Sequence, residues 1–260
     1  MNRKPFLCVA YSLLISISCT AQTPVKEIRF PNGKICILLD SVAAGEAITF
    51  DQTDGYFEKV KASEMSIQMR KPLAEGQSQA EWVAAYREFL KTDVEGFTAD
   101  ESTFIKGVME KVFRTVNDVS PDIFPDTVKL IKTKGRHYGD GVWYTRENCI
   151  VIPADELGRR KTNPFTTTMY HELFHVWSRL NPAKSDLAYQ LIGFEDIGYK
   201  NLRLPEALAA RALYNPDGVD FAQKITLTQA DGSMIHAIPI IYSNHEGWTD
   251  AQNTFFAYLE

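Results

Sequence analysis

Two histidines one helical turn apart, with a glutamate directly after the first, are the residues whose spacing most clearly predicts chemistry. They form the segment His171-Glu172-Leu173-Phe174-His175. Side chains four residues apart on a helix have Cβ atoms about 5–6 Å apart, so both imidazoles can bind one metal ion at about 2.0–2.1 Å. This H-E-x-x-H spacing on a helix is typical of a catalytic zinc site.

The residues around the motif predict a helix that holds both histidines on one side. Asn163-Pro164 favours a helix start, with Asn as the cap, and Asn181-Pro182 favours a helix stop. Between them, apolar residues recur at spacings of three and four, which predicts a stripe that packs into the core. The stripe consists of Phe165, Met169, Leu173, Trp177 and Leu180.

The motif and the strand-then-helix order before it resemble the zincin metallopeptidases. The resemblance covers about residues 127–220, where the segments 175–182 and 192–194 are similar to an exported bacterial branch of this family. It implies a zinc ion held by His171 and His175, a peptide or protein substrate, and Glu172 as the general base toward a water molecule. The chemistry agrees, because zinc lowers the pKa of a water ligand to about 7 and polarises a carbonyl.

A catalytic zinc site of this kind needs a third protein ligand, and the sequence leaves its identity open. Asp186, followed by Tyr189, partly matches the D-x-x-Y pattern of aspzincins, and Glu195 has a thermolysin-like spacing from the second histidine. Glu206 and Glu246 are weaker candidates. Each of these carboxylates also fits an ordinary surface position.

The end of the chain offers another source for this ligand. Residues 254–260 are an apolar run without a stop signal, so we expect a C-terminally truncated chain whose third ligand lies beyond residue 260. The alternative function is a non-catalytic zincin-fold binding module, in which the metal site is degenerate and the helix is a scaffold.

The fold class predicted is α+β: a small mixed or antiparallel sheet, then the H-E-x-x-H helix and further helices, the zincin-like order that the resemblance implies. Short β-type segments between turn residues predict that residues 22–74 form a small N-terminal sheet. These segments are residues 27–30, 34–39, 47–50, 56–60 and 65–69.

Residues 75–260 are predicted to form the catalytic domain. Apolar periodicity predicts helices at residues 77–91 and 98–117, the second beginning with a capping box between Thr98 and Glu101. Strands are predicted at residues 127–132, 141–145 and 149–153, the last two as a hairpin. In zincins such an edge strand aligns the substrate by strand addition, although a purely structural hairpin fits equally well.

The segment after the predicted catalytic helix contains further candidates. Residues 223–228 and 233–242 flank Ala230-Asp231-Gly232, which predicts a scaffold hairpin. Several aromatic and imidazole side chains there could stabilise an oxyanion, although a structural role is the simpler interpretation of each. They are Tyr189, Tyr199, Tyr242, His236 and His245.

Residues 1–21 have the pattern of an export signal, with a basic start, an apolar stretch too short to span a membrane, and small residues at the end. We expect cleavage after Ala21 rather than a lipid anchor at Cys19, and a periplasmic, extracellular or envelope location. The mature chain keeps Cys36 and Cys149, for which two buried thiols are favoured over a disulfide.

The charge balance excludes one class of partner. The chain has 28 Lys and Arg against 33 Asp and Glu in 260 residues, and a formal net charge of −5. A mildly acidic chain without a basic run has no electrostatic basis for binding nucleic acid.

Overall fold

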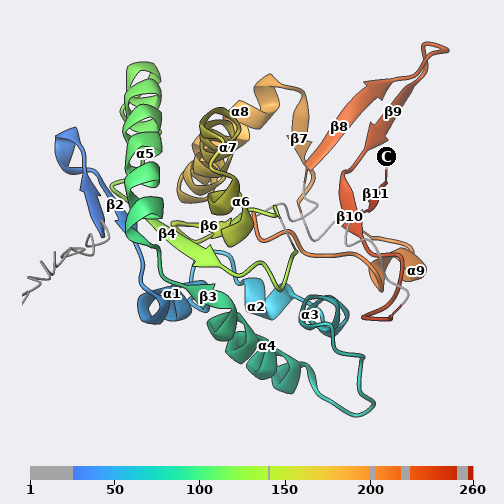
Figure 1. Cartoon of the computed structure of the whole chain (residues 1–260). Coiled ribbons are helices and arrows are strands. Elements are labelled where there is room, and N and C mark those ends of the chain that lie inside the picture. Colours follow the sequence, from blue (N-terminus) through green and yellow to red (C-terminus); the bar gives the residue numbers. More distant parts are fainter. Residues whose placement is uncertain (1–25, 140, 199–202, 218–222, 251–256, 260) are drawn as a thin grey trace, which may run out of the picture.

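A mixed β-sheet with helices packed on both faces organises the protein (Figure 1). The computed structural model of the chain describes residues 26–139, 141–198, 203–217, 223–250 and 257–259. In this part of the chain, six strands form the main sheet. Five follow one another across it in the order β1 (Glu27–Arg29), β2 (Ile35–Leu38), β4 (Thr127–Thr133), β6 (Cys149–Pro153) and β5 (Tyr144–Arg146), and β3 (Val94–Glu95) pairs with the end of β4.

The central strands β2, β4 and β6 run parallel, and the outer strands β1 and β5 are antiparallel to their neighbours. Parallel strands covered on both faces form from continuous apolar runs, and β6 is buried along its whole length. Its side chains alternate between two cores, with Ile150 and Ile152 on one face and Cys149 and Val151 on the other. The predicted strands at residues 127–132 and 149–153, and the hairpin that joins β5 to β6, are confirmed.

Each face of the sheet has its own set of helices. The face with Ile150 packs against α5 (Ala99–Val119), α6 (Ala154–Arg159) and α7 (Thr162–Leu180). The opposite face packs against α1 (Ser41–Ile48), α2 (Tyr56–Lys59), α3 (Ala62–Met69) and α4 (Gln79–Asp93). The predicted helices at residues 77–91 and 98–117 are confirmed as α4 and α5. The capping box of α5 is present, with Thr98 N–H donating to Glu101 Oε2 (2.8 Å) and Glu101 N–H donating to Thr98 Oγ1 (3.2 Å).

The prediction of a separate N-terminal sheet is wrong. Residues 47–50, 56–60 and 65–69 lie in α1, α2 and α3 or directly after them, and β2 joins the main sheet through β4. Asp40 starts α1, because its Oδ1 accepts hydrogen bonds from the N–H groups of Val42 (3.1 Å) and Ala43 (3.0 Å). The polar residues of the alternating segment 65–69 do not face solvent, because Ser66 and Gln68 are both fully buried.

The helix with the H-E-x-x-H motif is confirmed, but it begins earlier than predicted. α7 starts at Thr162, so Asn163 lies inside the helix and is not its cap. Pro164 falls within the first turn, where a missing N–H breaks no helical hydrogen bond. The helix ends at Leu180 as predicted, and Asn181-Pro182 leads directly into α8 (Pro182–Leu191).

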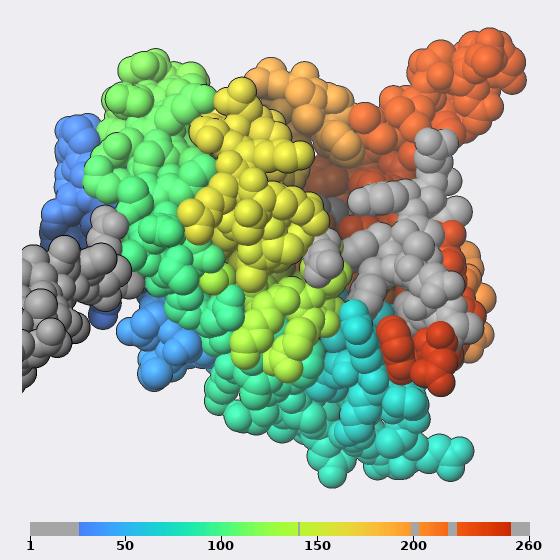
Figure 2. All heavy atoms as spheres, viewed as in Figure 1, coloured from blue at the N-terminus to red at the C-terminus, as the bar shows by residue number. Residues whose placement is uncertain are grey.

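Small antiparallel sheets follow α8. One contains β7 (Phe194–Asp196), β8 (Gln223–Thr228) and β9 (Met234–Ala237). The short helix α9 (Glu206–Ala209) lies between β7 and β8 in the chain. The other sheet pairs β10 (Ile240–Tyr242) with β11 (Ala257–Leu259). The predicted hairpin around Asp231 is confirmed and projects from the body of the molecule (Figure 2). Its second strand does not extend to residue 242, because Pro239 lacks the N–H that a continuous strand would need.

Cys36 and Cys149 are free thiols, and both are buried. They lie on β2 and β6, which are separated by β4. Burial raises the pKa of both thiols, that of Cys149 to about 11. The favoured prediction of two buried thiols is therefore confirmed, and the raised pKa values favour the protonated, less reactive form.

Some predictions concern residues outside the described part of the chain. They are the export signal at residues 1–21 with Cys19, Tyr199, and the terminal run at residues 254–260 apart from β11. Within the described residues, no helix has both the length and the hydrophobicity needed to cross a membrane.

Candidate metal and active site

α7 brings the two histidines of the motif together. The Nε2 atoms of His171 and His175 are 2.9 Å apart and their ring centroids are 4.5 Å apart, so both rings turn the same nitrogen toward one point. The predicted apolar stripe is shorter than expected, because Leu180 is 43% exposed and Trp177 is only half-buried. The residues that anchor α7 in the core are Phe165, Met169, Leu173 and Val176.

Glu172 lies on the flank of α7 between the histidines and the core. It is 3% exposed, and its buried Oε2 has no hydrogen-bond partner among the described residues. Burial raises the pKa of Glu172 to about 9, the charge of Asp217 adds to this rise, and the charge of Arg179 opposes it. A carboxylate with a raised pKa is a stronger base, and Glu172 also has an oxygen free for a ligand.

The same surroundings act on His175. Burial lowers the pKa of His175, the charge of Asp217 opposes this effect, and the charges of His171 and Arg179 add to it. The lowered pKa favours the neutral imidazole, which is the form that binds a metal ion.

A cavity of about 630 Å³ lies beside α7. His171 and Glu172 form part of one wall, and residues 141–144, which lead into β5 and include its first residue, form another. Glu64 on α3 and residues 213–217 complete it. The described residues that line it include the carboxyl groups of Glu64, Glu156, Glu172 and Asp217 but no Lys or Arg. The cavity is therefore acidic, and it is large enough for part of a peptide.

Residues 213–217 form an irregular segment that is held over α7 by four different elements. Hydrogen bonds fix it at both ends and in the middle, so Asp217 has a defined place in the cavity wall. The bonds run from Leu213 N–H to Ile241 C=O (2.8 Å), from Tyr214 N–H to Glu64 Oε2 (2.7 Å), from Arg179 Nη2 to Pro216 C=O (2.7 Å) and from Thr145 N–H to Asp217 Oδ1 (2.6 Å).

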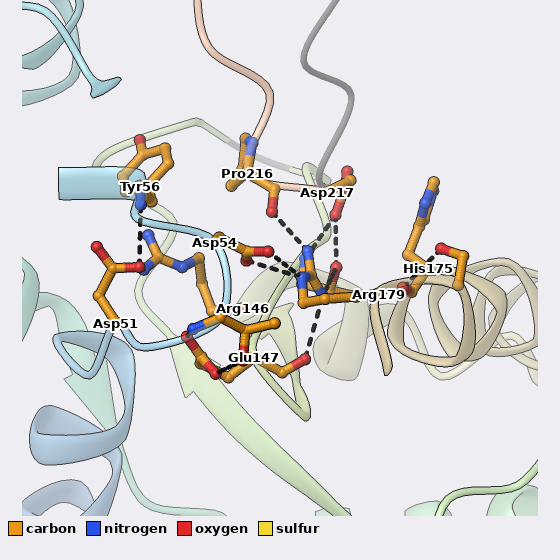
Figure 3. Close-up of polar contacts among 12 residues, drawn as sticks. Asp51, Asp54, Tyr56, Arg146, Glu147, His175, Arg179, Pro216 and Asp217 are labelled. Carbon is orange, nitrogen blue, oxygen red and sulfur yellow. Dashed lines mark hydrogen bonds and ion pairs between the residues drawn. The ribbon is translucent and has the colours of Figure 1, made fainter. Parts of the chain in front are cut away.

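Arg179 connects this segment to α7. Its side chain is 3% exposed, and its Nε lies 2.7 and 2.9 Å from the two carboxylate oxygens of Asp54. Figure 3 shows the guanidinium between Asp54 and Pro216, with His175 one turn earlier on the helix. Its Nη1 donates to Thr145 Oγ1 (3.0 Å), which itself donates to Asp217 Oδ1 (3.0 Å). Arg179 thus fixes the position of Asp217 relative to the motif.

The arrangement supplies two nitrogens that can bind a metal ion and a buried carboxyl that can exchange a proton beside them. No family model, curated protein or solved structure matches this chain. The chemistry of the site is therefore argued from its own geometry.

The carboxylates considered as a third ligand do not lie at the cavity. Asp186 on α8, Glu206 on α9 and Glu246 are exposed. The carboxylate of Glu195 pairs with Lys224 at 3.0 Å and is 61% exposed. Among the described residues, no three His, Cys, Asp or Glu side chains are placed to hold a metal ion. A ligand beyond residue 260 stays a prediction.

Four of the predicted oxyanion-stabilising residues lie in the described part of the chain, and they line other surfaces than the cavity. Tyr189 packs edge-on against Phe174, with ring centroids 6.2 Å apart, and His236 is exposed and contacts Thr226. His245 is exposed as well, and Tyr242 lies under Arg211. Sequence reasoning missed Glu64, Arg179 and Asp217, of which only Arg179 carried a local signal, because it follows His175 by four residues on the same helix.

Glu64 is the most deeply buried carboxyl group of the cavity wall, with 2% of its surface exposed. Its Oε2 accepts from Tyr214 N–H (2.7 Å) and its Oε1 from Gln68 Nε2 (2.9 Å), and it forms no ion pair with a described residue. Burial raises the pKa of Glu64 to about 8, because these hydrogen bonds and the charge of Lys61 only partly offset the loss of water.

The free energy of unfolding should fall as the pH rises through the range in which Glu64 ionises. An ordinary glutamate has a pKa of 4.5 and folded Glu64 about 8, so the folded chain binds the extra proton between these values. Each pH unit in this window should cost up to about 1.4 kcal/mol. Urea unfolding across the window should show this loss in the wild type and in the exposed control Glu110→Gln. In Glu64→Gln the loss should shrink to the part that Glu172 contributes, because the pKa of Glu172 is raised as well. An equal slope in all three would mean that Glu64 is already ionised.

Proposed function

We propose that the chain is an exported zinc-dependent peptidase of the zincin type, with Glu172 as its general base. The observation that carries the proposal is the convergence of the His171 and His175 Nε2 atoms, 2.9 Å apart, beside a buried carboxyl oxygen without a hydrogen-bond partner. His171 and Glu172 both line a cavity that can admit a peptide.

The two imidazole nitrogens fit zinc as two of the three protein ligands that such a site needs. Two imidazole nitrogens from positions i and i+4 of a helix are the usual first two ligands, and Glu172 occupies the position of the base. Bound zinc would polarise the substrate carbonyl and make a water ligand more acidic. Glu172 would accept a proton from water and deliver it to the leaving amine, a role for which its unpartnered oxygen is free.

Residues 141–144 support the peptide as substrate, because they line the cavity where the chain enters the outer strand β5. The N–H of Thr145 on β5 already donates to Asp217 Oδ1 at 2.6 Å, so a substrate strand cannot pair there. Strand addition would therefore use the backbone of residues 141–143.

The zinc content of the purified chain tests this proposal. Elemental mass spectrometry should find one zinc ion per chain in the wild type and in the control variant His236→Ala, whose exposed imidazole lies on β9 away from the cavity. His171→Ala should contain none, because a single imidazole cannot hold the ion. Zinc retained in His171→Ala would contradict the site. A folded wild-type chain without zinc would mean either that the third ligand is missing from these residues or that the chain is the non-catalytic binding module.

A further inference from the structure

The cavity at the proposed active site continues away from the histidines. His171 and Glu172 on α7 line one part of it, and Glu64 on α3 and Asp217 line others. Since the described lining contains no Lys or Arg, none of its carboxyl groups pairs with a cation within the cavity wall. A volume of about 630 Å³ leaves room for a side chain, and the carboxyl group of Glu64 is part of the wall that such a side chain would meet.

The carboxyl group of Glu64 lacks a countercharge. A carboxylate taken out of water is stable only when charges or several hydrogen bonds compensate it. Glu64 accepts hydrogen bonds from Tyr214 N–H, from Gln68 Nε2 and, at 3.5 Å, from the Tyr56 hydroxyl, all of them neutral groups. The charge of Lys61 reaches it, but the Lys61 ammonium donates to the Ala209 carbonyl instead. A cation arriving from the cavity would supply the missing charge.

Aromatic rings make up part of the same cavity wall. Tyr138, Trp143, Tyr144 and Tyr214 all contribute to the cavity wall. The hydroxyl of Tyr138 bonds to that of Tyr56 in the core (3.0 Å), and the hydroxyl of Tyr144 bonds to His137 Nε2 (2.5 Å). Since these hydroxyl groups are engaged in the core, the tyrosines offer their rings to the cavity. Aromatic rings pack against aliphatic stems and attract cations.

Glu172, on another part of the cavity wall, also indicates a ligand that donates hydrogen bonds. Glu172 is 3% exposed, lines the cavity and has an Oε2 that accepts no hydrogen bond from the described residues. A buried acceptor without a donor costs free energy unless a ligand provides one. The cavity wall thus has several aromatic rings and two carboxyl groups, Glu172 and Glu64, that lack a donor or a countercharge.

We propose that the cavity binds a cationic nitrogen group on an apolar stem, so that the preferred substrates are peptides with a basic group next to the scissile bond. The inference rests on the proposed peptidase function and names its substrate class. The stem lies against the aromatic wall, and the cationic nitrogen reaches the carboxyl of Glu64. Lysine and arginine side chains and the α-ammonium group of a peptide share this chemistry.

Peptide pairs that differ only in charge test the proposal on the wild-type chain. The pairs are lysine against norleucine, arginine against citrulline, and a free against an acetylated N-terminus. The kcat/KM should be at least about tenfold higher for the charged member of the side-chain pairs, since a buried charged interaction is worth more than 1.4 kcal/mol. A difference confined to the N-terminal pair would identify the α-ammonium group as the cation. Equal values in every pair would overturn the proposal and leave the peptidase function intact.

Matched variants locate the charge that is responsible. Glu64→Gln keeps the shape of the side chain and should bring the charged-to-neutral ratio close to one, while the zinc content stays at one ion per chain. Glu156→Gln is the control, because Glu156 lines the same cavity but already pairs with Arg159 at 2.7 Å. Its ratio should stay high. Equal loss in both variants would overturn the role of Glu64, whereas a chain without zinc that cleaves neither member of any pair would contradict the proposed function itself.

Discussion

Replacing Glu172 with alanine should reduce kcat by about 10²–10⁴-fold while one zinc ion per chain stays bound, because proton transfer is lost and both histidines remain. Steady-state kinetics on the zinc-loaded variant, with the zinc content measured on the same sample, would check this. The control is Glu110→Gln on the neighbouring helix α5, a half-exposed carboxylate that pairs with Lys106 and lies outside the cavity. It should keep the wild-type rate.

Stability provides a second measurement on the same residue. Glu172 is 3% exposed, and its Oε2 has no hydrogen-bond partner among the described residues. This buried oxygen therefore adds no hydrogen bond that would stabilise the folded state. Glu172→Gln should therefore melt at the wild-type temperature or above it, as expected where a functional group is kept at a cost to stability. Wild-type turnover in Glu172→Ala would contradict the role of Glu172 as general base. Loss of zinc together with turnover would mean that Glu172 has a structural role.

The part of the site that could be predicted from the sequence is the part that a single helix supplies. His171, Glu172 and His175 need only the i, i+4 geometry of α7, and that helix is marked by its apolar periodicity and by Asn181-Pro182 at its end. The structure confirms the helix and the approach of the two imidazoles. Its start was less predictable, because a proline fits any position of the first turn.

The rest of the cavity wall depends on contacts between distant segments. Glu64 contacts the backbone of Tyr214, 150 residues further along the chain. Thr145 holds Asp217 over a separation of 72 residues. No local pattern encodes such pairs, because each residue looks like an ordinary surface or turn residue until the chain has folded. Burial then distinguishes them, since carboxyl groups are seldom taken out of water without a reason.

The N-terminal region shows how a local pattern can mislead. The alternation Met65-Ser66-Ile67-Gln68-Met69 has the period of a strand, yet it lies in α3. A period of two predicts a strand only when the polar residues face water. Here Ser66 donates to the Lys71 carbonyl at 2.6 Å and Gln68 to Glu64 at 2.9 Å, both in the interior. Buried polar networks thus remove the contrast on which hydrophobic periodicity depends.

Arg179→Met should lower the free energy of unfolding by about 3–5 kcal/mol, because it leaves the carboxylate of Asp54 buried without its partner. Methionine keeps the apolar stem, so the loss reports the guanidinium group rather than packing. Arg179 Nε lies 2.7 Å from Asp54, and the side chains are 3% and 13% exposed. Arg29→Met is the control, since its pair with Glu27 is largely solvent-exposed and should contribute less than about 1 kcal/mol. Urea unfolding of both variants at neutral pH gives the comparison.

A second substitution separates the cost of an unpaired charge from the loss of the hydrogen bonds that hold residues 213–217. Adding Asp54→Asn to Arg179→Met should restore part of the lost stability, because the uncompensated carboxylate is removed. The part not restored belongs to the bonds from Arg179 to Pro216 C=O (2.7 Å) and to Thr145 Oγ1 (3.0 Å), which hold the segment carrying Asp217 over α7. If Arg179→Met cost no more than Arg29→Met, the buried pair with Asp54 would not exist in solution. The position of Asp217 beside Glu172 and His175 would then need another explanation.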